Sequence, residues 1–187
     1  IDGDKTSTVL VSVDGSSDPN FVGLDNQSIN VVTIDDDESN ILITEIDLLT
    51  SEDGDQGFFE VRLTSRPDSP VTVSFSSSNL NEGDVIPEIT FNSSNWDQPQ
   101  LVHVTGIDDF PPVTDGPQDY DISVSNVFSL DLNYGTIDPN AFNPITFTNQ
   151  DNDSPAVIVK VMNDDYTTSE DLESVVIGFK LTSEPLS

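Results

Sequence analysis

The sequence has no cysteine, one histidine, one methionine, one tryptophan, and five lysine and arginine residues together in 187 positions. Without cysteine, the chain can form no disulfide and no zinc–thiolate site, and it has no thiol nucleophile. A single histidine also excludes a multi-histidine metal site within this chain. No apolar run approaches the roughly 20 residues of a membrane-spanning helix, so we expect no membrane insertion in this segment.

Basic residues are scarce beside 35 acidic ones, and the formal net charge is -30. Nucleic acids bind to basic surfaces, so this charge excludes an ordinary nucleic-acid-binding protein. The acids comprise 26 aspartates and nine glutamates. Aspartate is a poor residue for helix interiors and a common one in turns, so we expect most of the acids in loops.

Hydrophobic residues make up 34% of the chain, which is enough to form a core despite the charge. Short runs alternate apolar and polar residues, the pattern of half-buried strands. The runs lie at 41–46, 59–63, 71–75, 89–91, 101–107, 120–124 and 145–147. No long segment carries the 3.6-residue stripe of a helix. We predict an all-β fold, an immunoglobulin-like antiparallel β-sandwich of about seven strands.

The sequence repeats itself at a spacing of about 116 residues. Leu63-Thr64-Ser65 returns as Leu181-Thr182-Ser183, and Asp35-Asp36-Asp37 returns as Asp151-Asn152-Asp153. A fixed period of this kind is the signature of tandem repeat proteins. We therefore expect the predicted sandwich to occur in tandem repeats.

This period divides the chain into three parts. We predict that residues 1–39 are the C-terminal part of a preceding repeat, residues 40–154 a complete repeat, and residues 155–187 the N-terminal part of a following repeat. Neighbouring repeats of the same chain are then the first expected partners. Partial repeats leave strand edges open, so strand addition between like chains in a fibre is a second expectation.

Several motifs in the predicted complete repeat occur in the order and spacing of one known family. They are Thr50-Ser51-Glu52-Asp53-Gly54, Val71-Thr72-Val73-Ser74-Phe75, Ser76-Ser77-Ser78-Asn79, Ile107-Asp108-Asp109 and Asp115-Gly116, followed by the acidic triplet. With them the chain resembles the Calx-beta family. This is the calcium-binding β-sandwich of sodium–calcium exchangers and of tandem arrays in bacterial surface proteins and adhesins.

The resemblance implies a Ca²⁺ site at one end of the sandwich. The positions that match its ligands are Glu52, Asp84, Asp108, Asp109, Asp115, Asp151 and Asp153, with Asp35, Asp36 and Asp37 as the corresponding triplet of the preceding repeat. The chemistry agrees, because Ca²⁺ prefers six to eight hard oxygen ligands and adjacent carboxylates repel one another without a cation. Asn152 replaces the middle acid of one triplet, which predicts a weaker or smaller cluster of ions.

These features lead us to expect a calcium-stabilised structural segment of an extracellular or cell-surface protein, acting as a rod or spacer in adhesion or in a surface fibre. We expect no catalysis, because no acidic pair stands out by an apolar setting. Two alternatives remain open. One is a β-sandwich module that binds host or surface glycans or proteins, for example around Trp96. The other is a halophilic spacer whose acids hold no specific calcium.

Overall fold

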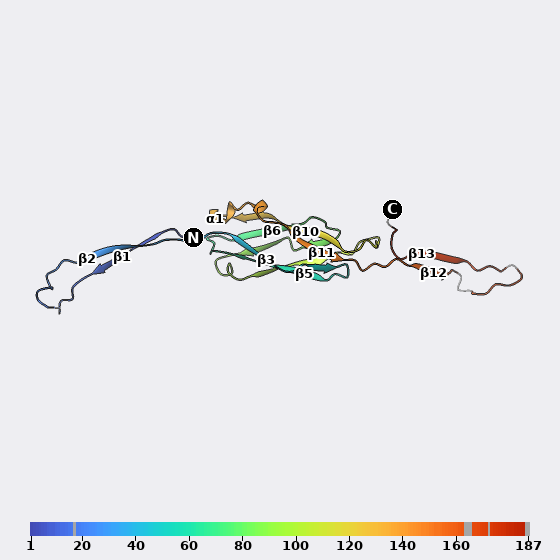
Figure 1. Ribbon diagram of the computed structural model, residues 1–187, viewed down its shortest axis with the longest axis horizontal. Helices are drawn as coiled ribbons and strands as arrows, with labels where there is room; N and C mark the ends of the chain where they lie inside the picture. The colour runs from blue at the N-terminus through green and yellow to red at the C-terminus, as the bar shows by residue number, and fades with distance from the viewer. Residues whose placement is uncertain (17, 163–165, 172, 186–187) are drawn as a thin grey trace.

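The computed structural model describes residues 1–16, 18–162, 166–171 and 173–185. A β-sandwich forms the middle of the elongated molecule, and a two-stranded hairpin projects from each end (Figure 1). The N-terminal hairpin pairs β1 (Lys5–Val11) with β2 (Gln27–Thr33), and the C-terminal hairpin pairs β12 (Val157–Val161) with β13 (Ile177–Leu181).

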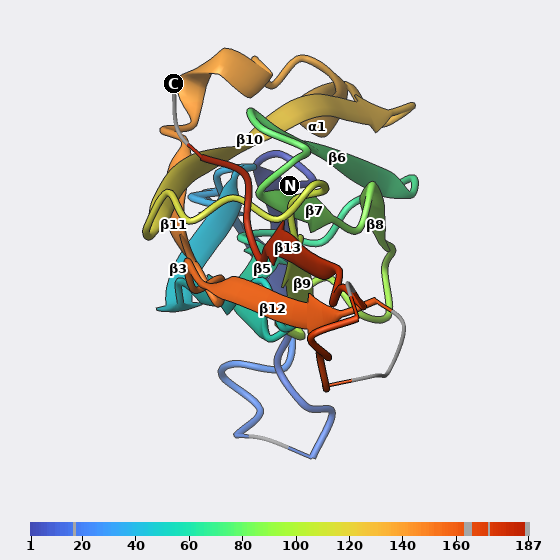
Figure 2. The same ribbon diagram turned by 90° about the vertical axis from the view of Figure 1, so that its right-hand side faces the viewer.

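The sandwich has two sheets. Figure 2, which looks along the long axis of the molecule, shows one sheet above the other. The five-stranded sheet has the order β4 (Leu49–Ser51), β11 (Ile145–Gln150), β10 (Gln118–Ser129), β6 (Val71–Ser77) and β8 (Glu88–Phe91). The four-stranded sheet has the order β3 (Ile41–Asp47), β5 (Gln56–Leu63), β9 (Gln100–Gly106) and β7 (Gly83–Val85). Strand β4 runs parallel to β11, and the other pairings are antiparallel. The predicted all-β sandwich is confirmed.

The core lies between the two sheets and follows from the alternation in the sequence. Phe59, Val61 and Leu63 on β5 point inward and are fully buried. The ring of Phe59 lies 5.4 Å from that of Phe75 and 6.3 Å from that of Phe147, which belong to the other sheet. Full burial of one such side chain stabilises a fold by about 1.5–3 kcal/mol, so these contacts hold the two layers together.

One short helical connection closes the end of the sandwich that faces the N-terminal hairpin. Between β10 and β11 lies helix α1 (Leu132–Gly135), and a 3-10 turn (Pro139–Ala141) follows it. Asp131 is the N-cap of α1, and its carboxylate accepts the backbone N–H of Asn133 at 2.9 Å. Tyr134 of α1 is 1% exposed, and its hydroxyl donates to the carbonyl of Ser65 at 2.6 Å. This bond fastens the connection to the end of β5.

The two hairpins repeat pairings found inside the sandwich. Val157 pairs with Leu181 as Ile41 pairs with Leu63, and the loops beside them match as well. Thr64 Oγ1 donates to the carbonyl of Glu38 at 2.6 Å, and Thr182 Oγ1 donates to that of Ser154 at the same distance. The hairpin of β12 and β13 therefore has the local geometry of β3 and β5, at the offsets that the sequence repeats.

The N-terminal hairpin matches β10 and β11 in the same way. Lys5 pairs with Thr33 and Val9 with Ile29 on one side, and Gln118 pairs with Asn149 and Ile122 with Ile145 on the other. The apolar side chains that are buried in the sandwich have exposed counterparts in both hairpins, such as Val9 and Ile29. The division of the chain at residues 39 and 154 remains a prediction.

Candidate metal centre

Five acidic side chains converge at the end of the sandwich that faces the C-terminal hairpin. Glu52 follows β4, Asp109 and Asp115 lie in the loop between β9 and β10, and Asp151 and Asp153 follow β11. Carboxylate oxygens of Glu52, Asp109 and Asp115 lie within 4.8 Å of one another, as do those of Glu52, Asp151 and Asp153. Glu52 belongs to both groups and is the centre of the cluster.

Glu52 is a buried carboxylate among like charges. Its side chain is 6% exposed, and Oε2 accepts a hydrogen bond from the backbone N–H of Asn152 at 2.9 Å. Burial raises the pKa of Glu52, and the neighbouring carboxylates of Asp151, Asp109 and Asp153 raise it further, against the opposing effect of the Asn152 N–H. A bound cation would remove this conflict by neutralising the group.

Asp109 and Asp153 are also carboxylates whose pKa is raised by burial and by like charges. Burial raises the pKa of Asp109, and Asp115 and Asp153 add to the shift, although the carboxylate accepts the N–H of Val113 at 2.9 Å. Burial also raises the pKa of Asp153, followed by the charge of Asp108. Within the described part of the chain, buried Asp153 Oδ2 has no hydrogen-bond partner. A buried oxygen without a donor costs free energy, and a metal ion would satisfy it.

The other predicted ligands of this repeat are placed differently. Asp108 is exposed at the edge of the cluster, where it contributes to the raised pKa of Asp153. Asp84 lies on β7 with an exposed side chain, accepts the N–H of Val85 at 2.9 Å, and belongs to neither group of acids. The structure therefore brings Glu52 and four of the aspartates together and leaves Asp84 aside.

Two buried polar residues beneath the cluster were not among the predicted site residues. Glu82, just before β7, is 9% exposed, and Asn149 on β11 is 1% exposed. Asn149 Nδ2 donates to Glu82 Oε2 at 3.2 Å. The sequence does contain a signal for Asn149. The residue follows Ile145 and Phe147 at the same spacing of two, so it faces the core as they do, but its side chain is polar. Glu82 lies in a loop without such a phase, and its position depends on the fold.

At the other end of the sandwich, the triplet of Asp35, Asp36 and Asp37 repeats part of this arrangement. Asp35 Oδ2 accepts the N–H of Gly3 at 2.6 Å and Oδ1 that of Asp37 at 3.1 Å, and the N–H of Gly3 leads in lowering the pKa of Asp35. Asp36 and Asp37 are exposed. Among the described residues, the triplet is in no group of three acids close enough to share an ion.

Asp151 makes the corresponding two hydrogen bonds. Its Oδ2 accepts the N–H of Gly116 at 2.7 Å, and its Oδ1 accepts that of Asp153 at 2.6 Å. Gly3 and Gly116 share a positive φ, of 71° and 77°. These are left-handed conformations that glycine adopts readily. The first acid of each triplet thus holds an equivalent Asp-Gly turn at each end of the sandwich.

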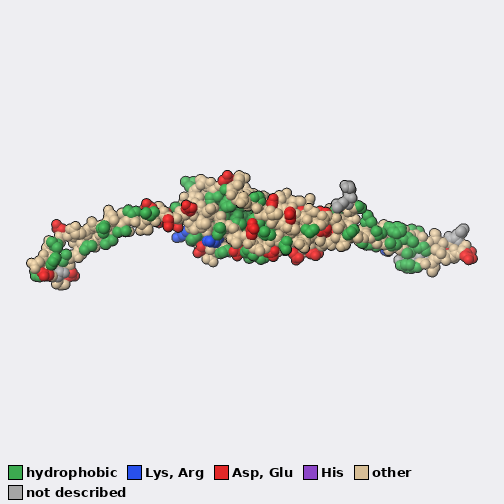
Figure 3. Space-filling view, viewed as in Figure 1, with side chains coloured by type: hydrophobic (Ala, Val, Ile, Leu, Met, Phe, Trp, Pro, Cys, Tyr) green, Lys and Arg blue, Asp and Glu red, His purple; other side chains and the backbone are tan. Residues whose placement is uncertain are grey.

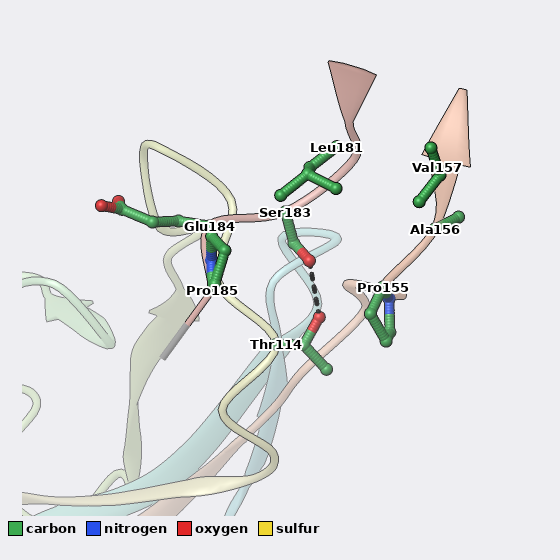
Figure 4. A pocket seen from close by; sticks show the side chains of 8 residues that line it. All are labelled: Thr114, Pro155, Ala156, Val157, Leu181, Ser183, Glu184 and Pro185. Atoms are coloured by element: carbon green, nitrogen blue, oxygen red, sulfur yellow. Dashed lines mark hydrogen bonds between the residues drawn. The ribbon is translucent and has the colours of Figure 1, made fainter. Parts of the chain in front are cut away.

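The acidic loop between β9 and β10 also contacts the chain after β13. The backbone N–H of Glu184 donates to the carbonyl of Pro112 at 2.6 Å, and the hydroxyls of Thr114 and Ser183 lie 3.0 Å apart (Figure 4). Val113 and Glu184 form an isolated parallel β-bridge. The loop that carries Asp109 and Asp115 is therefore joined to the C-terminal hairpin.

A pocket of about 450 Å³ lies beside this contact and is lined by Thr114, Pro155, Ala156, Val157, Leu181, Ser183, Glu184 and Pro185 (Figure 4). Its lining includes Ser183, the counterpart of Ser65 by the sequence repeat. In the sandwich, Ser65 is covered by Tyr134. The pocket therefore lies beside the counterpart of the position that Tyr134 contacts in the sandwich.

On the face drawn in Figure 3, acidic side chains are spread along the sandwich, and the few lysines and arginines visible lie mainly near its N-terminal end. The acidic cluster around Glu52, called the pole below, differs from these acids because Glu52 is buried and because the pKa values of Glu52, Asp109 and Asp153 are raised. In the described residues, no helix is both long enough and apolar enough to cross a membrane.

Comparison with known proteins leaves the family of this chain open. Neither a protein-family model nor a curated protein sequence matches it. A solved structure described as WR4, a member of the MSP family from C. elegans, aligns with 59% of this chain and 95% of its own at 14% sequence identity and a TM-score of 0.32. So low a TM-score supports no argument on fold or function, so the function is inferred from the site.

Proposed function

We propose that this chain is a calcium-stabilised structural segment of an extracellular surface protein, acting as a rod or spacer in adhesion or in a surface fibre. The observation that supports this most is the convergence of Glu52 with four aspartates beside the contact to the next hairpin. Oxygen ligands from three separate segments at one pole suit Ca²⁺, which accepts six to eight of them in a flexible geometry.

The ion would act by linkage between binding and folding. An ion that binds only the ordered pole stabilises it by RT ln(1 + [Ca²⁺]/Kd), which is about 1.4 kcal/mol at ten times Kd. Extracellular calcium modules work at a Kd of roughly 0.1–1 mM, so millimolar calcium is sufficient. The raised pKa values of Glu52, Asp109 and Asp153 support this, because burial and, after it, the neighbouring carboxylates disfavour the charged forms, and a cation would offset both effects.

The position of the pole explains how a bound ion would stiffen the junction between the sandwich and the C-terminal hairpin. Asp109 and Asp115 lie on the same loop as Pro112, Val113 and Thr114, which bond to the chain after β13. An ion that fixes this loop would also fix the surface on which the next repeat rests. Matching hydrogen bonds of Asp35 and Asp151 support the idea that such junctions recur along a longer array.

The proposal is tested by thermal unfolding and small-angle X-ray scattering of the chain in calcium and in a chelator. We expect chelation to lower the melting temperature by about 4–8 °C, since about 1.4 kcal/mol corresponds to a shift of this size in a domain of about 100 residues. Scattering should also show a wider range of angles between the sandwich and the C-terminal hairpin. Identical melting and scattering in both conditions would contradict the proposal.

The stability of the chain in sodium chloride distinguishes the proposed calcium-stabilised segment from an acidic halophilic spacer. If the acids act only through general charge screening, sodium at sufficient ionic strength should stabilise the chain as well as calcium does. A specific site should respond to millimolar calcium at constant ionic strength. Trp96 is partly buried against the core, and this gives no support to a glycan-stacking surface there.

A further inference from the structure

We propose that Asn149 is the positioning residue of the candidate metal centre, and that its buried amide sets the geometry and the affinity of the site for Ca²⁺. This inference rests on the calcium-binding function proposed above. It concerns a residue that does not itself belong to either group of acids.

The amide of Asn149 uses both of its polar ends. Nδ2 donates to the carbonyl of Ile107 at 2.9 Å and to Glu82 Oε2 at 3.2 Å, and Oδ1 accepts a hydrogen bond from Thr50 Oγ1 at 3.1 Å. The side chain is 1% exposed, so water does not compete for these bonds. Hydrogen bonds in a buried network are strengthened by the low local dielectric.

Two of these contacts, those with Thr50 and Ile107, lead directly to segments that carry candidate ligands. Thr50 lies two residues before Glu52, Ile107 two residues before Asp109, and Asn149 itself two residues before Asp151. One side chain therefore joins the three segments whose carboxylates must meet around an ion. The loop before β7 is tied in as well, because the N–H of Ile107 donates to the carbonyl of Glu82 at 3.0 Å.

The surroundings hold this amide in place. A Cβ at Gly106 would lie 2.5 Å from Asn149 Oδ1 and 2.1 Å from the carbonyl oxygen of Ser51, so the absence of a side chain at Gly106 allows the strands to approach. On the other side, Thr50 Oγ1 also contacts the hydroxyl of Tyr120 at 3.0 Å. Asn149 has no room to reorient without moving these groups.

The chemistry of the position requires an amide. Aspartate would place a second carboxylate against Glu82, and leucine would leave the carbonyl of Ile107 and the carboxylate of Glu82 without their donor. Residues that orient the ligands of a metal without binding it commonly affect metal affinity by about 10–100-fold. We expect an effect of this size on the Kd for calcium.

The test is calcium titration by calorimetry of the whole chain, together with its melting temperature in chelator. Asn149→Leu should raise the Kd for Ca²⁺ by about 10–100-fold. Thr50→Val, which removes the hydroxyl that donates to Asn149, should also raise the Kd, whereas Thr50→Ser keeps the hydroxyl and should restore it. Tyr134→Phe is the matched control, because it removes buried hydrogen bonds at the opposite end of the sandwich.

A purely structural role for Asn149 predicts another result. Asn149→Leu would then lower the melting temperature in chelator, as Tyr134→Phe does, and leave the Kd for calcium unchanged; this overturns the inference on Asn149 alone. If the wild-type chain shows no saturable calcium binding, both this inference and the proposed function fail. Should Asn149→Leu not fold, the comparison of Thr50→Val with Thr50→Ser decides.

Discussion

Glu52 accepts a hydrogen bond from the backbone N–H of Asn152, a residue 100 positions later in the chain. The bond joins the beginning of the sandwich to the acidic triplet at its end. It also holds a buried carboxylate beside Asp151 and Asp153, where burial and like charges raise the pKa of Glu52. The fold thus stabilises an arrangement of acids that is unfavourable by itself.

Replacing Glu52 by glutamine should have opposite effects with and without calcium. In chelator at pH 7, Glu52→Gln should stabilise the chain by about 1 kcal/mol, because the amide keeps an acceptor for Asn152 and removes a buried charge. In millimolar calcium it should destabilise the chain by a similar amount, because a central ligand is lost. Denaturant unfolding in both conditions measures this.

The matched control for that prediction is Glu88→Gln, which changes an exposed glutamate on β8. It should have little effect in either condition. A Glu52→Gln variant that is destabilised equally in calcium and in chelator would contradict the account, because its carboxylate would then stabilise the fold without an ion.

The stability of the calcium-free chain should increase as the pH falls through the raised pKa values of Glu52, Asp109 and Asp153 toward their ordinary values. The raised pKa values of Glu52, Asp109 and Asp153 mean that the folded state binds more protons than the unfolded state at pH values above their ordinary pKa values of 4.5 and 3.8. The free energy of unfolding therefore decreases as the pH rises through this window. Melting temperatures in chelator at several pH values test the sign.

The lowered pKa values of Asp14, Asp35 and Asp138 act in the opposite direction only at lower pH. Their stabilisation is lost as the pH falls below their ordinary value of 3.8 through the folded values. Glu52→Gln should reduce the pH dependence above the ordinary pKa of 4.5, which separates the contribution of Glu52 from the general charge repulsion of the chain. Equal slopes of stability against pH for the wild type and the variant would contradict a raised pKa of Glu52.

Gly106→Ala should weaken both the fold and the candidate site. The new methyl group would lie 2.1 Å from the carbonyl oxygen of Ser51, so β4 must move away from β9. Overpacking of this kind costs about 1–3 kcal/mol. Gly15→Ala is the control, since nothing lies within 4 Å of a methyl group there. Chemical denaturation compares the two, and equal stabilities would contradict the predicted close contact.

Tyr134→Phe should lower the free energy of unfolding by about 1–3 kcal/mol, because the substitution leaves buried groups of Ser65 without their partner. Calcium affinity should not change, as the residue lies at the other end of the sandwich. Tyr166→Phe alters a largely exposed tyrosine and should be neutral. A neutral Tyr134→Phe would show that its hydroxyl does not fasten α1 to β5.

Much of the fold could be predicted from the alternation of apolar and polar residues. Phe59, Val61 and Leu63 are spaced by two and are all buried, as the pattern indicates. Strands β4 and β7 could not be identified, because each has three residues with only one large apolar side chain, so no alternation is visible. Strand β4 also pairs in parallel with a strand almost 100 residues away, a contact without a local signal.

The candidate site was predictable to a lesser extent. The resemblance to a known family placed Glu52, Asp151 and Asp153 at one end of the predicted sandwich, and the recurrence of the acidic triplet favoured an ion over plain turns. Asp84 was included by that resemblance, but its side chain is exposed on β7 and belongs to neither group of acids. Glu82 and Asn149 meet through the fold across 67 residues, and the sequence has no marker for such a pairing.

The most direct test of the account is a crystal grown in calcium chloride and measured for anomalous scattering. We expect a calcium peak at the pole between β4, the β9–β10 loop and the end of β11, with Glu52 and two or more of Asp109, Asp115, Asp151 and Asp153 at about 2.3–2.6 Å from the ion. The absence of a peak there at millimolar calcium, or a peak at exposed acids only, would contradict the central claim.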